Sequence, residues 1–304
     1  MKTRYRHYRI PGLVLLLLLP SLWQGLNAQK PTENSLFWEI SGMGIEKPSY
    51  LFGTYHLLGG GYLSELPKVK KVFEQADGIV VETEIDSSKI FQMMPMMVMS
   101  GTKLSDLVSP EDYALITREV EETTGASMDM LAQFKPISIT LMLTVAYANK
   151  ESREELSRYD GPPLDSYFAN VGKKNNKPIE TFETMEEQMR IIFDHDTVEE
   201  QARQLVEFVR SRDDMIRAQS ELLQMYLDQD LNGLFSLYKR YEKQFGDATY
   251  LLDDRNVKWM KKLPGMIEKG NRFIAVGALH LTGGNSLIRL LRENGYTVTP
   301  VASR

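Results

Sequence analysis

Two histidines occupy the same short pattern in distant parts of the chain. Residues 53–56 read Gly-Thr-Tyr-His after the apolar run Tyr-Leu-Phe, and residues 277–280 read Gly-Ala-Leu-His after Phe-Ile-Ala-Val. Glycine lets the backbone leave a sheet where a side chain would clash. We therefore expect His56 and His280 just beyond the carboxyl ends of two buried strands, the edge where open α/β sheets bind ligands.

An acidic segment is predicted at the same edge of the sheet. Residues 78–85 read Gly-Ile-Val-Val-Glu-Thr-Glu-Ile and are predicted to form a strand. Its apolar start is typical of a parallel-sheet strand that is covered on both faces. Because side chains alternate along a strand, Glu82 and Glu84 are expected to point to one face.

These residue types support several kinds of chemistry. Two imidazoles and a carboxylate can hold a divalent cation and leave positions open for water. Without a metal, one histidine can act as a general base while a carboxylate orients it. Both histidines could instead make only structural hydrogen bonds, since Gly-x-x-His alone is not a specific motif. The chain has no cysteine, so any metal ligands must be histidine or carboxylate.

Two other segments are interpreted as structural. Five methionines lie between residues 93 and 99. They favour a flexible core or lid helix because methionine fills irregular gaps, although a peptide groove or a copper site would also use them. Residues 194–196 read Asp-His-Asp, and we interpret them as the end of one helix and the cap of the next, with Asp196 as the capping residue.

Hydrophobic periodicity predicts an α/β fold in one domain. The expected architecture is a central mixed or parallel sheet flanked by helices, with residues 87–262 as a large, mostly helical insertion. Strands are predicted at 35–40, 49–53, 78–85, 178–182, 272–277 and 296–301. Helices are predicted at 66–77, 87–99, 110–124, 128–134, 136–150, 163–174, 197–228, 231–245, 249–262 and 285–294.

The first 28 residues are predicted to be a signal peptide, which leaves residues 29–304 as the mature domain. Four basic residues precede an unbroken apolar run from Leu13 to Leu19, and Ala28 is the expected cleavage position. A retained anchor is the alternative, but the apolar stretch is shorter than the roughly 20 residues that span a bilayer. The protein is expected to be exported, periplasmic or secreted, with no stable membrane span after cleavage.

The net charge of the mature domain argues against two classes of partner. Residues 1–28 contain four basic residues and no acid, so their removal changes the net charge from −5 to −9. An acidic domain is poorly suited to nucleic acid or to anionic membrane surfaces. The expected partner is a peptide or a small-molecule substrate, and no nucleic acid.

Six parts of the chain carry short patterns that occur together in one order. They are 51–57 (LxGTxHL), 81–85 (an acidic strand), 164–168 with 177–179 (gLD…gKpv), 182–188 (LEtxeeQ), 255–259 (RNxxW) and 276–298 (a closing signature). These segments resemble the signatures of the TraB/GumN family, which includes the pheromone-shutdown protein PrgY and the animal Tiki proteases. The resemblance extends from about residue 35 to residue 301. Phe182 stands where the family signature has leucine, a change that affects packing.

The resemblance implies a fold similar to erythromycin esterase and the haem-binding ChaN proteins. From the Tiki members it implies proteolysis that depends on a divalent metal, both Gly-x-x-His motifs and the acidic strand. Carried over, His56, Glu82 and His280 would hold a cation such as Mn²⁺, Co²⁺ or Zn²⁺. Glu84 or a histidine would move the proton.

Arg255 has two interpretations within this resemblance. Its guanidinium would bind an anionic group or stabilise an oxyanion, or it would form a salt bridge between its helix and the acidic strand. Glu183 and Gln188 are expected to support the site from behind its main residues. The alternative function for the whole protein is a non-catalytic regulator that binds peptide, haem or metal in the same cleft.

Overall fold

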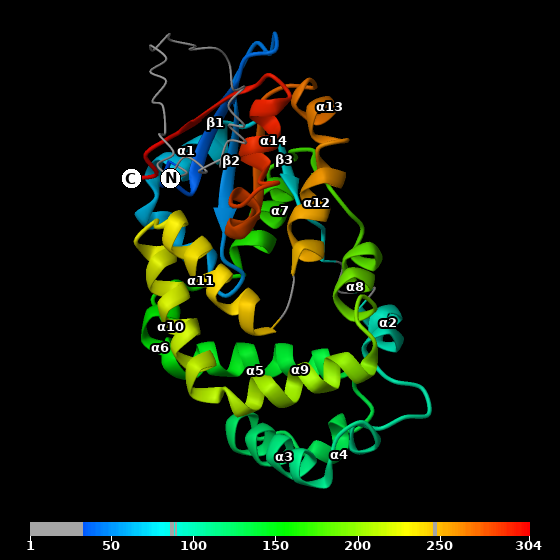
Figure 1. Ribbon diagram of the computed structural model, residues 1–304. Helices are drawn as coiled ribbons and strands as arrows, with labels where there is room; N and C mark the ends of the chain where they lie inside the picture. Colours follow the sequence, from blue (N-terminus) through cyan, green and yellow to red (C-terminus); the bar gives the residue numbers. More distant parts are fainter. Residues whose placement is uncertain (1–32, 86–87, 89, 246–247) are drawn as a thin grey trace, which may run out of the picture. The chain divides into compact units, whose positions relative to one another are not determined.

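The computed structural model describes residues 33–85, 88, 90–245 and 248–304 (Figure 1). The predicted signal peptide, residues 1–28, lies outside the described residues. Among the helices that are described, none combines the length and the apolar character needed to cross a bilayer.

Six strands of the described chain form one mixed sheet in the order β4-β3-β5-β2-β1-β6. The pairs β4–β3, β3–β5 and β5–β2 are parallel, and β1 runs antiparallel to both β2 and β6. The predicted α/β class is confirmed, and of the two predicted kinds of sheet, mixed or parallel, the structure has the mixed one. The strands are β1 (Phe37–Ser41), β2 (Ser49–Thr54), β3 (Gly78–Val81), β4 (Ile179–Thr181), β5 (Arg272–Gly277) and β6 (Thr297–Pro300).

The strand order brings the two Gly-x-x-His motifs side by side. In the parallel β2–β5 ladder, Gly53 pairs with Val276 and Thr54 with Gly277. Strand β3, which precedes Glu82, lies on the other side of β5. Segments that are more than two hundred residues apart in the sequence therefore end at one edge of the sheet.

The helices contribute to two hydrophobic cores. Their bounds are α1 (Pro67–Gln75), α2 (Ile90–Met93), α3 (Pro110–Thr124), α4 (Met128–Leu131), α5 (Pro136–Glu151), α6 (Arg153–Ser157), α7 (Leu164–Lys174), α8 (Met185–Phe193), α9 (Val198–Arg210), α10 (Arg212–Leu227), α11 (Leu231–Phe245), α12 (Asp253–Trp259), α13 (Leu263–Ile267) and α14 (Leu287–Glu293), with a short 3₁₀ helix η6 (Ala278–Leu281).

The first core lies around the sheet. Phe73 of α1 and Phe168 of α7 both pack against Phe273 of β5, with ring centroids 5.4 and 4.8 Å apart respectively. Figure 1 shows α7 behind the strands and α14 in front of them. Helix α7 and strand β4 come from within residues 87–262, so this mostly helical range also supplies parts of the sheet layer.

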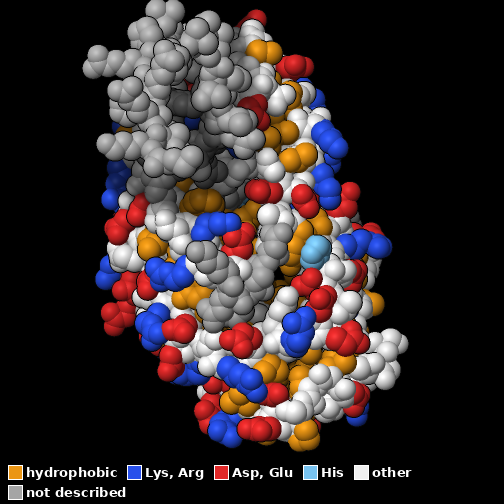
Figure 2. Space-filling model, viewed as in Figure 1, with side chains coloured by type: hydrophobic (Ala, Val, Ile, Leu, Met, Phe, Trp, Pro, Cys, Tyr) orange, Lys and Arg blue, Asp and Glu red, His pale blue; other side chains and the backbone are white. Residues whose placement is uncertain are grey.

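The second core joins α3, α5, α9 and α10 in the helical region below the sheet in Figure 1. Leu143 and Tyr147 of α5 are fully buried there, with Leu205 of α9. On the face seen in Figure 2, acidic and basic side chains are interspersed over this region, unlike the single-sign stripe that binds nucleic acid. The expectation that nucleic acid is not a partner stays a prediction.

Several local predictions need correction. The strand predicted at 78–85 ends at Val81, because its ladders with β4 and β5 end at Thr181 and Ala275, so both acids lie in the following loop. The single helix predicted at 197–228 is broken at Ser211. The break redirects the chain, since α9 packs into the second core while the end of α10 packs into the first.

The helix predicted at 249–262 is instead a 3₁₀ turn, Thr249–Leu251, followed by α12, and the helix predicted at 128–134 ends at Leu131. A further correction concerns the cap before α9. Thr197, rather than Asp196, is the capping residue, and its hydroxyl accepts a hydrogen bond from the Glu200 backbone N–H. Asp196 instead accepts from Gln204, and His195 stacks on the ring of Tyr250 at 3.5 Å between centroids. This segment is therefore a helix connection, as interpreted, with a different cap.

The methionine segment forms the short α2 and a 3₁₀ turn, Met94–Met97. Within the segment Met99 is buried and Met94 is exposed.

Candidate functional site

The candidate site lies at the carboxyl edge of the parallel strands. His56 follows β2 by two residues, Glu82 follows β3 directly, Glu183 follows β4 by two residues, and His280 lies in η6 after β5. Because these four strands run in the same direction, their carboxyl ends meet at one edge. That edge is where open α/β sheets place their ligands.

Gly277 marks the point where the three main predicted residues meet. A methyl group at this glycine would lie 3.4 Å from Glu82 Oε1, 3.6 Å from His280 Cδ2 and 3.6 Å from His56 Nε2. The Gly277 N–H donates to Glu82 Oε1 at 2.7 Å. The structure thus brings His56, Glu82 and His280 together, although their chemical roles stay predictions.

His56 forms a dyad with Asp165, which lies in the first turn of α7. The Nδ1 atom of His56 is 2.6 Å from Asp165 Oδ2, and the hydroxyl of Thr54 donates to the other carboxylate oxygen. The His56 side chain is 68% exposed. The negative charge of Asp165 raises the pKa of His56 to about 9, so at neutral pH this imidazole is protonated and accessible.

The sequence alone gives Asp165 no functional role beyond its place in a family signature. One feature of the sequence could have indicated a role for Asp165. It lies in the first turn of a helix, from which its carboxylate can reach the edge of the sheet. Only the packing of α7 against β3 shows that the carboxylate faces His56.

Glu82 and Glu183 hold Arg255 of α12 between them. Arg255 Nη2 donates to Glu82 Oε2 at 2.6 Å and also to Glu183, and its Nε donates to Glu183 Oε2 at 3.3 Å. All three residues are at least nine-tenths buried. Burial alone would raise the pKa of Glu82, but the adjacent histidines and the guanidinium outweigh it and lower the pKa to about 2.

His280 is buried and neutral, unlike His56. Burial lowers the pKa of His280 to about 4, and the charge of Arg255 acts in the same direction. Its Nε2 lies 3.2 Å from Arg255 Nη1, which can only donate, so Nε2 accepts. The proton therefore sits on Nδ1, which donates to Asn256 Oδ1 at 2.7 Å. Asn256 is oriented in turn by two backbone carbonyls, to which its amide nitrogen donates.

The guanidinium of Arg255 has no donor left for a ligand. Its five N–H groups point to Glu183 twice, to Glu82, to His280 and, at 3.0 Å, to the Leu251 carbonyl. These contacts support the salt-bridge interpretation of Arg255. The role of Arg255 in binding an oxyanion stays a prediction. To donate a hydrogen bond to an oxyanion, the guanidinium would first have to break one of these five bonds.

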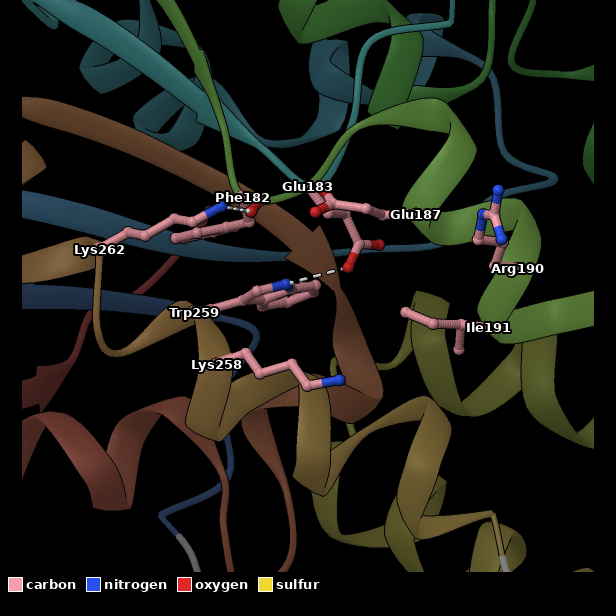
Figure 3. A pocket seen from close by; sticks show the side chains of 8 residues that line it. All are labelled: Phe182, Glu183, Glu187, Arg190, Ile191, Lys258, Trp259 and Lys262. Atoms are coloured by element: carbon pink, nitrogen blue, oxygen red, sulfur yellow. Dashed lines mark hydrogen bonds between the residues drawn. The ribbon is translucent and has the colours of Figure 1, made fainter. Parts of the chain in front are cut away.

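Trp259 supports the same cluster from behind. Its indole N–H donates to Glu183 Oε2 at 3.2 Å, as Figure 3 shows, and its ring stacks on Phe182 with centroids 4.8 Å apart. The indole ring also contacts two residues of the site. Arg255 Cζ lies 4.7 Å from the ring centroid, and the His280 ring packs against it with centroids 4.4 Å apart. Glu183 thus supports the site from behind, as expected.

A cavity opens beside the dyad with a volume of about 440 Å³. Four acidic or histidine side chains line it. They are Glu82 and Glu84 of the loop after β3, and His56 and Asp165 of the dyad. Glu84 pairs with Lys173 at 2.5 Å. Gln188 also lines the cavity and donates to Glu82 Oε2 at 3.3 Å, so it acts on the site through Glu82.

The predicted metal ligands do not form a three-ligand site in this arrangement. His280 presents carbon Cδ2 toward Gly277. Its Nε2 lies 3.6 Å from Glu82 Oε1, but the nearer contact of that nitrogen is the Arg255 Nη1 donor at 3.2 Å, so its lone pair is already used by Arg255. Across the described parts of the chain, no three histidine or carboxylate side chains are grouped to hold a metal ion. Protein metal sites that keep an open position typically use three ligands. The metal roles of His56, Glu82 and His280 stay predictions.

Comparison with known proteins places this site in a family. Uncharacterized protein YbaP of Shigella flexneri is 24% identical over 289 residues, which cover 91% of this chain and 99% of YbaP. Metalloprotease TIKI1 of Danio rerio is 23% identical over 327 residues, and Metalloprotease TIKI1 of Xenopus tropicalis is 22% identical over 349 residues. These alignments cover 90% and 95% of this chain, and 64% and 67% of the TIKI1 proteins.

No solved structure matches this chain. The likeness to erythromycin esterase and ChaN therefore stays a prediction. The family model of the TraB/PrgY/gumN family matches residues 36–300, which include the whole sheet and every site residue described above. The chain therefore belongs to the TraB/PrgY/gumN family.

Proposed function

We propose that this protein is a hydrolase that cleaves an amide bond of a peptide substrate in the cavity beside His56. The observation that carries the proposal is the exposed His56–Asp165 dyad, which lines the same cavity as Glu82 and Glu84. A histidine oriented by a carboxylate is a common acid–base device. The similarity to two proteins named metalloproteases supports peptide as the substrate class.

The proposed chemistry assigns different tasks to the residues that face the cavity. His56 enters as an imidazolium, donates a hydrogen bond to the substrate and then gives its proton to the leaving amine. Asp165 keeps the ring oriented and stabilises its charge. Glu84 pairs with Lys173 through Oε2 and accepts a proton from the attacking water on its other carboxylate oxygen. Glu82 is less suited to this task, because Gly277, Arg255 and Gln188 already bind both of its oxygens.

Peptide cleavage by the purified mature chain tests this proposal. A fluorogenic peptide library would be incubated with the native chain and with His56→Gln and Asp165→Asn variants. His195→Gln is the matched control, since His195 lies outside the cavity and stacks on Tyr250. Removal of an acid–base group should lower kcat by about 10²–10⁴-fold, with the control unchanged. Equal rates in all four proteins would reject the assignment.

A metal-dependent reaction is the alternative to the dyad acting alone, and it is raised by the names of the TIKI1 relatives. It is decided by repeating the peptide assay with chelator and after addition of Mn²⁺, Co²⁺ or Zn²⁺. Cleavage that is lost with chelator and restored by one cation supports a metal-dependent peptidase. Cleavage that chelator leaves untouched supports the dyad acting alone.

A non-catalytic binding role is the second candidate function. It is favoured by the saturated hydrogen bonding of Arg255 and Glu82, which leaves much of the cluster committed to structure. In this case peptide, haem or metal would bind in the cavity without turnover. Stoichiometric binding that requires His56, with intact peptide recovered afterwards, would support the binder over the hydrolase.

We also propose that the protein is exported after cleavage near Ala28. The support is the basic segment, the apolar run and the small residue at position 28. Amino-terminal sequencing of the protein recovered from an exported fraction would show a start close to residue 29. Recovery of the uncleaved chain in the cytoplasm would contradict the proposal.

A further inference from the structure

Arg255 carries a permanent positive charge into the place where the predicted metal ligands meet. Arginine stays protonated in proteins, so this charge cannot be removed by pH. Its guanidinium lies 2.6 Å from one oxygen of Glu82 and 3.2 Å from Nε2 of His280. A divalent cation on these two atoms would face that fixed charge at short range, where repulsion is strong in a buried site.

The lone pair that His280 would offer to a metal is already in use. Nε2 accepts from Arg255, and Nδ1 carries the proton that is donated to Asn256. Rotation of the ring would break the Asn256 bond and expose a buried nitrogen, and such unmade hydrogen bonds are costly. His280 is 3% exposed and packs against Trp259 at 4.4 Å, so the ring has little room to turn.

The guanidinium itself is held in place on several sides. Glu183 accepts two of its hydrogen bonds, the Leu251 carbonyl accepts another, and Trp259 packs against its face at 4.7 Å. Trp259 also fixes Glu183, as Figure 3 shows. Arg255 is 7% exposed, which leaves no path for it to swing out without opening this packing.

We propose that Arg255 is the built-in cation of this site and that it closes Glu82 and His280 to divalent metals. Removal of the guanidinium opens a metal site made of Glu82, His280 and the neighbouring His56. The inference concerns binding and does not depend on turnover, so it can fail or hold separately from the proposed hydrolase activity.

Zinc binding to the native mature chain is the first test. The mature chain contains three histidines, His56, His195 and His280, so ¹⁵N imidazole NMR can follow each ring. One equivalent of Zn²⁺ should leave the Nε2 resonance of His280 unchanged, whatever happens at exposed His56. A coordination shift at His280, together with one-to-one binding that Glu82→Gln abolishes, would overturn the proposal.

An Arg255→Met variant is the second test. Calorimetric titration should show Zn²⁺ binding about tenfold or more tighter than in the native chain, because a buried like charge has been removed. The His280 Nε2 resonance should then shift on zinc addition. Arg272→Met is the matched control, since Arg272 is also buried and paired with a carboxylate, Glu180, at the opposite end of β5.

The two tests together decide the question. A folded Arg255→Met chain that binds zinc no tighter than the Arg272→Met chain would contradict the proposal. If circular dichroism shows that Arg255→Met does not fold, the His280 resonance of the native chain still decides it. Neither readout requires a substrate.

Discussion

The two Gly-x-x-His motifs share a sequence pattern and a sheet edge but end in opposite environments. His56 is exposed and paired with Asp165, which raises its pKa to about 9. His280 is buried beside Arg255, and burial lowers its pKa to about 4. The difference comes from the helices that cover each motif, since α7 supplies a carboxylate to one and α12 supplies a guanidinium to the other. One motif is therefore suited to chemistry with solvent and substrate, and the other to holding the site together.

Replacement of Arg255, the residue beside His280, should produce the largest effect on stability. Arg255→Met leaves Glu82 and Glu183 buried without their partner, and breaking a buried ion pair in this way costs about 3–5 kcal/mol. Urea unfolding followed by circular dichroism measures the change. Arg240→Met is the control, since Arg240 pairs with Glu221 on the surface and should cost only about 0–1 kcal/mol. Equal losses in the two variants would show that the cluster does not stabilise the fold.

Alanine replacement of each histidine should affect a different property, stability for His280 and peptide cleavage for His56. His280→Ala removes a buried ring and its bond to Asn256, and should lower the free energy of unfolding by about 2–4 kcal/mol. His56→Ala removes an exposed ring and should change the free energy of unfolding by less than about 1 kcal/mol, while lowering the proposed peptide cleavage by about 10²–10⁴-fold. The comparison would break if His56→Ala were the more destabilising variant.

The two motif glycines should also differ, by a smaller amount. A methyl group at Gly53 would lie 3.0 Å from both Ala278 Cα and Leu281 Cδ1, whereas at Gly277 its nearest neighbour is 3.4 Å away. Overpacking against backbone costs about 1–3 kcal/mol, so Gly53→Ala should destabilise the chain clearly. Gly277→Ala meets ordinary contact distances and should be nearly neutral for stability. Thermal unfolding of the two variants in parallel would reveal a reversed order.

The pH response should be the mildest difference between the motifs. The pKa of His56 is raised from 6.5 to about 9, so its contribution to stability is fully present below pH 6.5 and is lost as the pH rises through 9. The contribution is small because the ring is exposed. Asp165→Asn should remove this part of the stability profile and move the NMR titration midpoint of His56 down toward 6.5. An unchanged midpoint would show that Asp165 is not the cause.

Much of the fold could be predicted because its signals are local. Strand β5 and helices α3 and α11 appear at the predicted residues, since apolar runs and helical spacing are properties of short segments. The break at Ser211 escaped prediction because one apolar stripe continues through both helices. It exists because α9 and the end of α10 belong to different cores, which is a tertiary fact.

The sequence by itself determined the family, the α/β class and the placement of His56, Glu82 and His280 near one edge, because parallel strands end together. Only the tertiary structure decided what surrounds each of them. Asp165, Asn256 and Arg255 reach the site from helices distant in sequence, and their charges and hydrogen bonds set which imidazole is protonated. Burial and electrostatic interactions depend on what is near in space, so one repeated motif provides an accessible acid at one end and a buried, neutral support at the other.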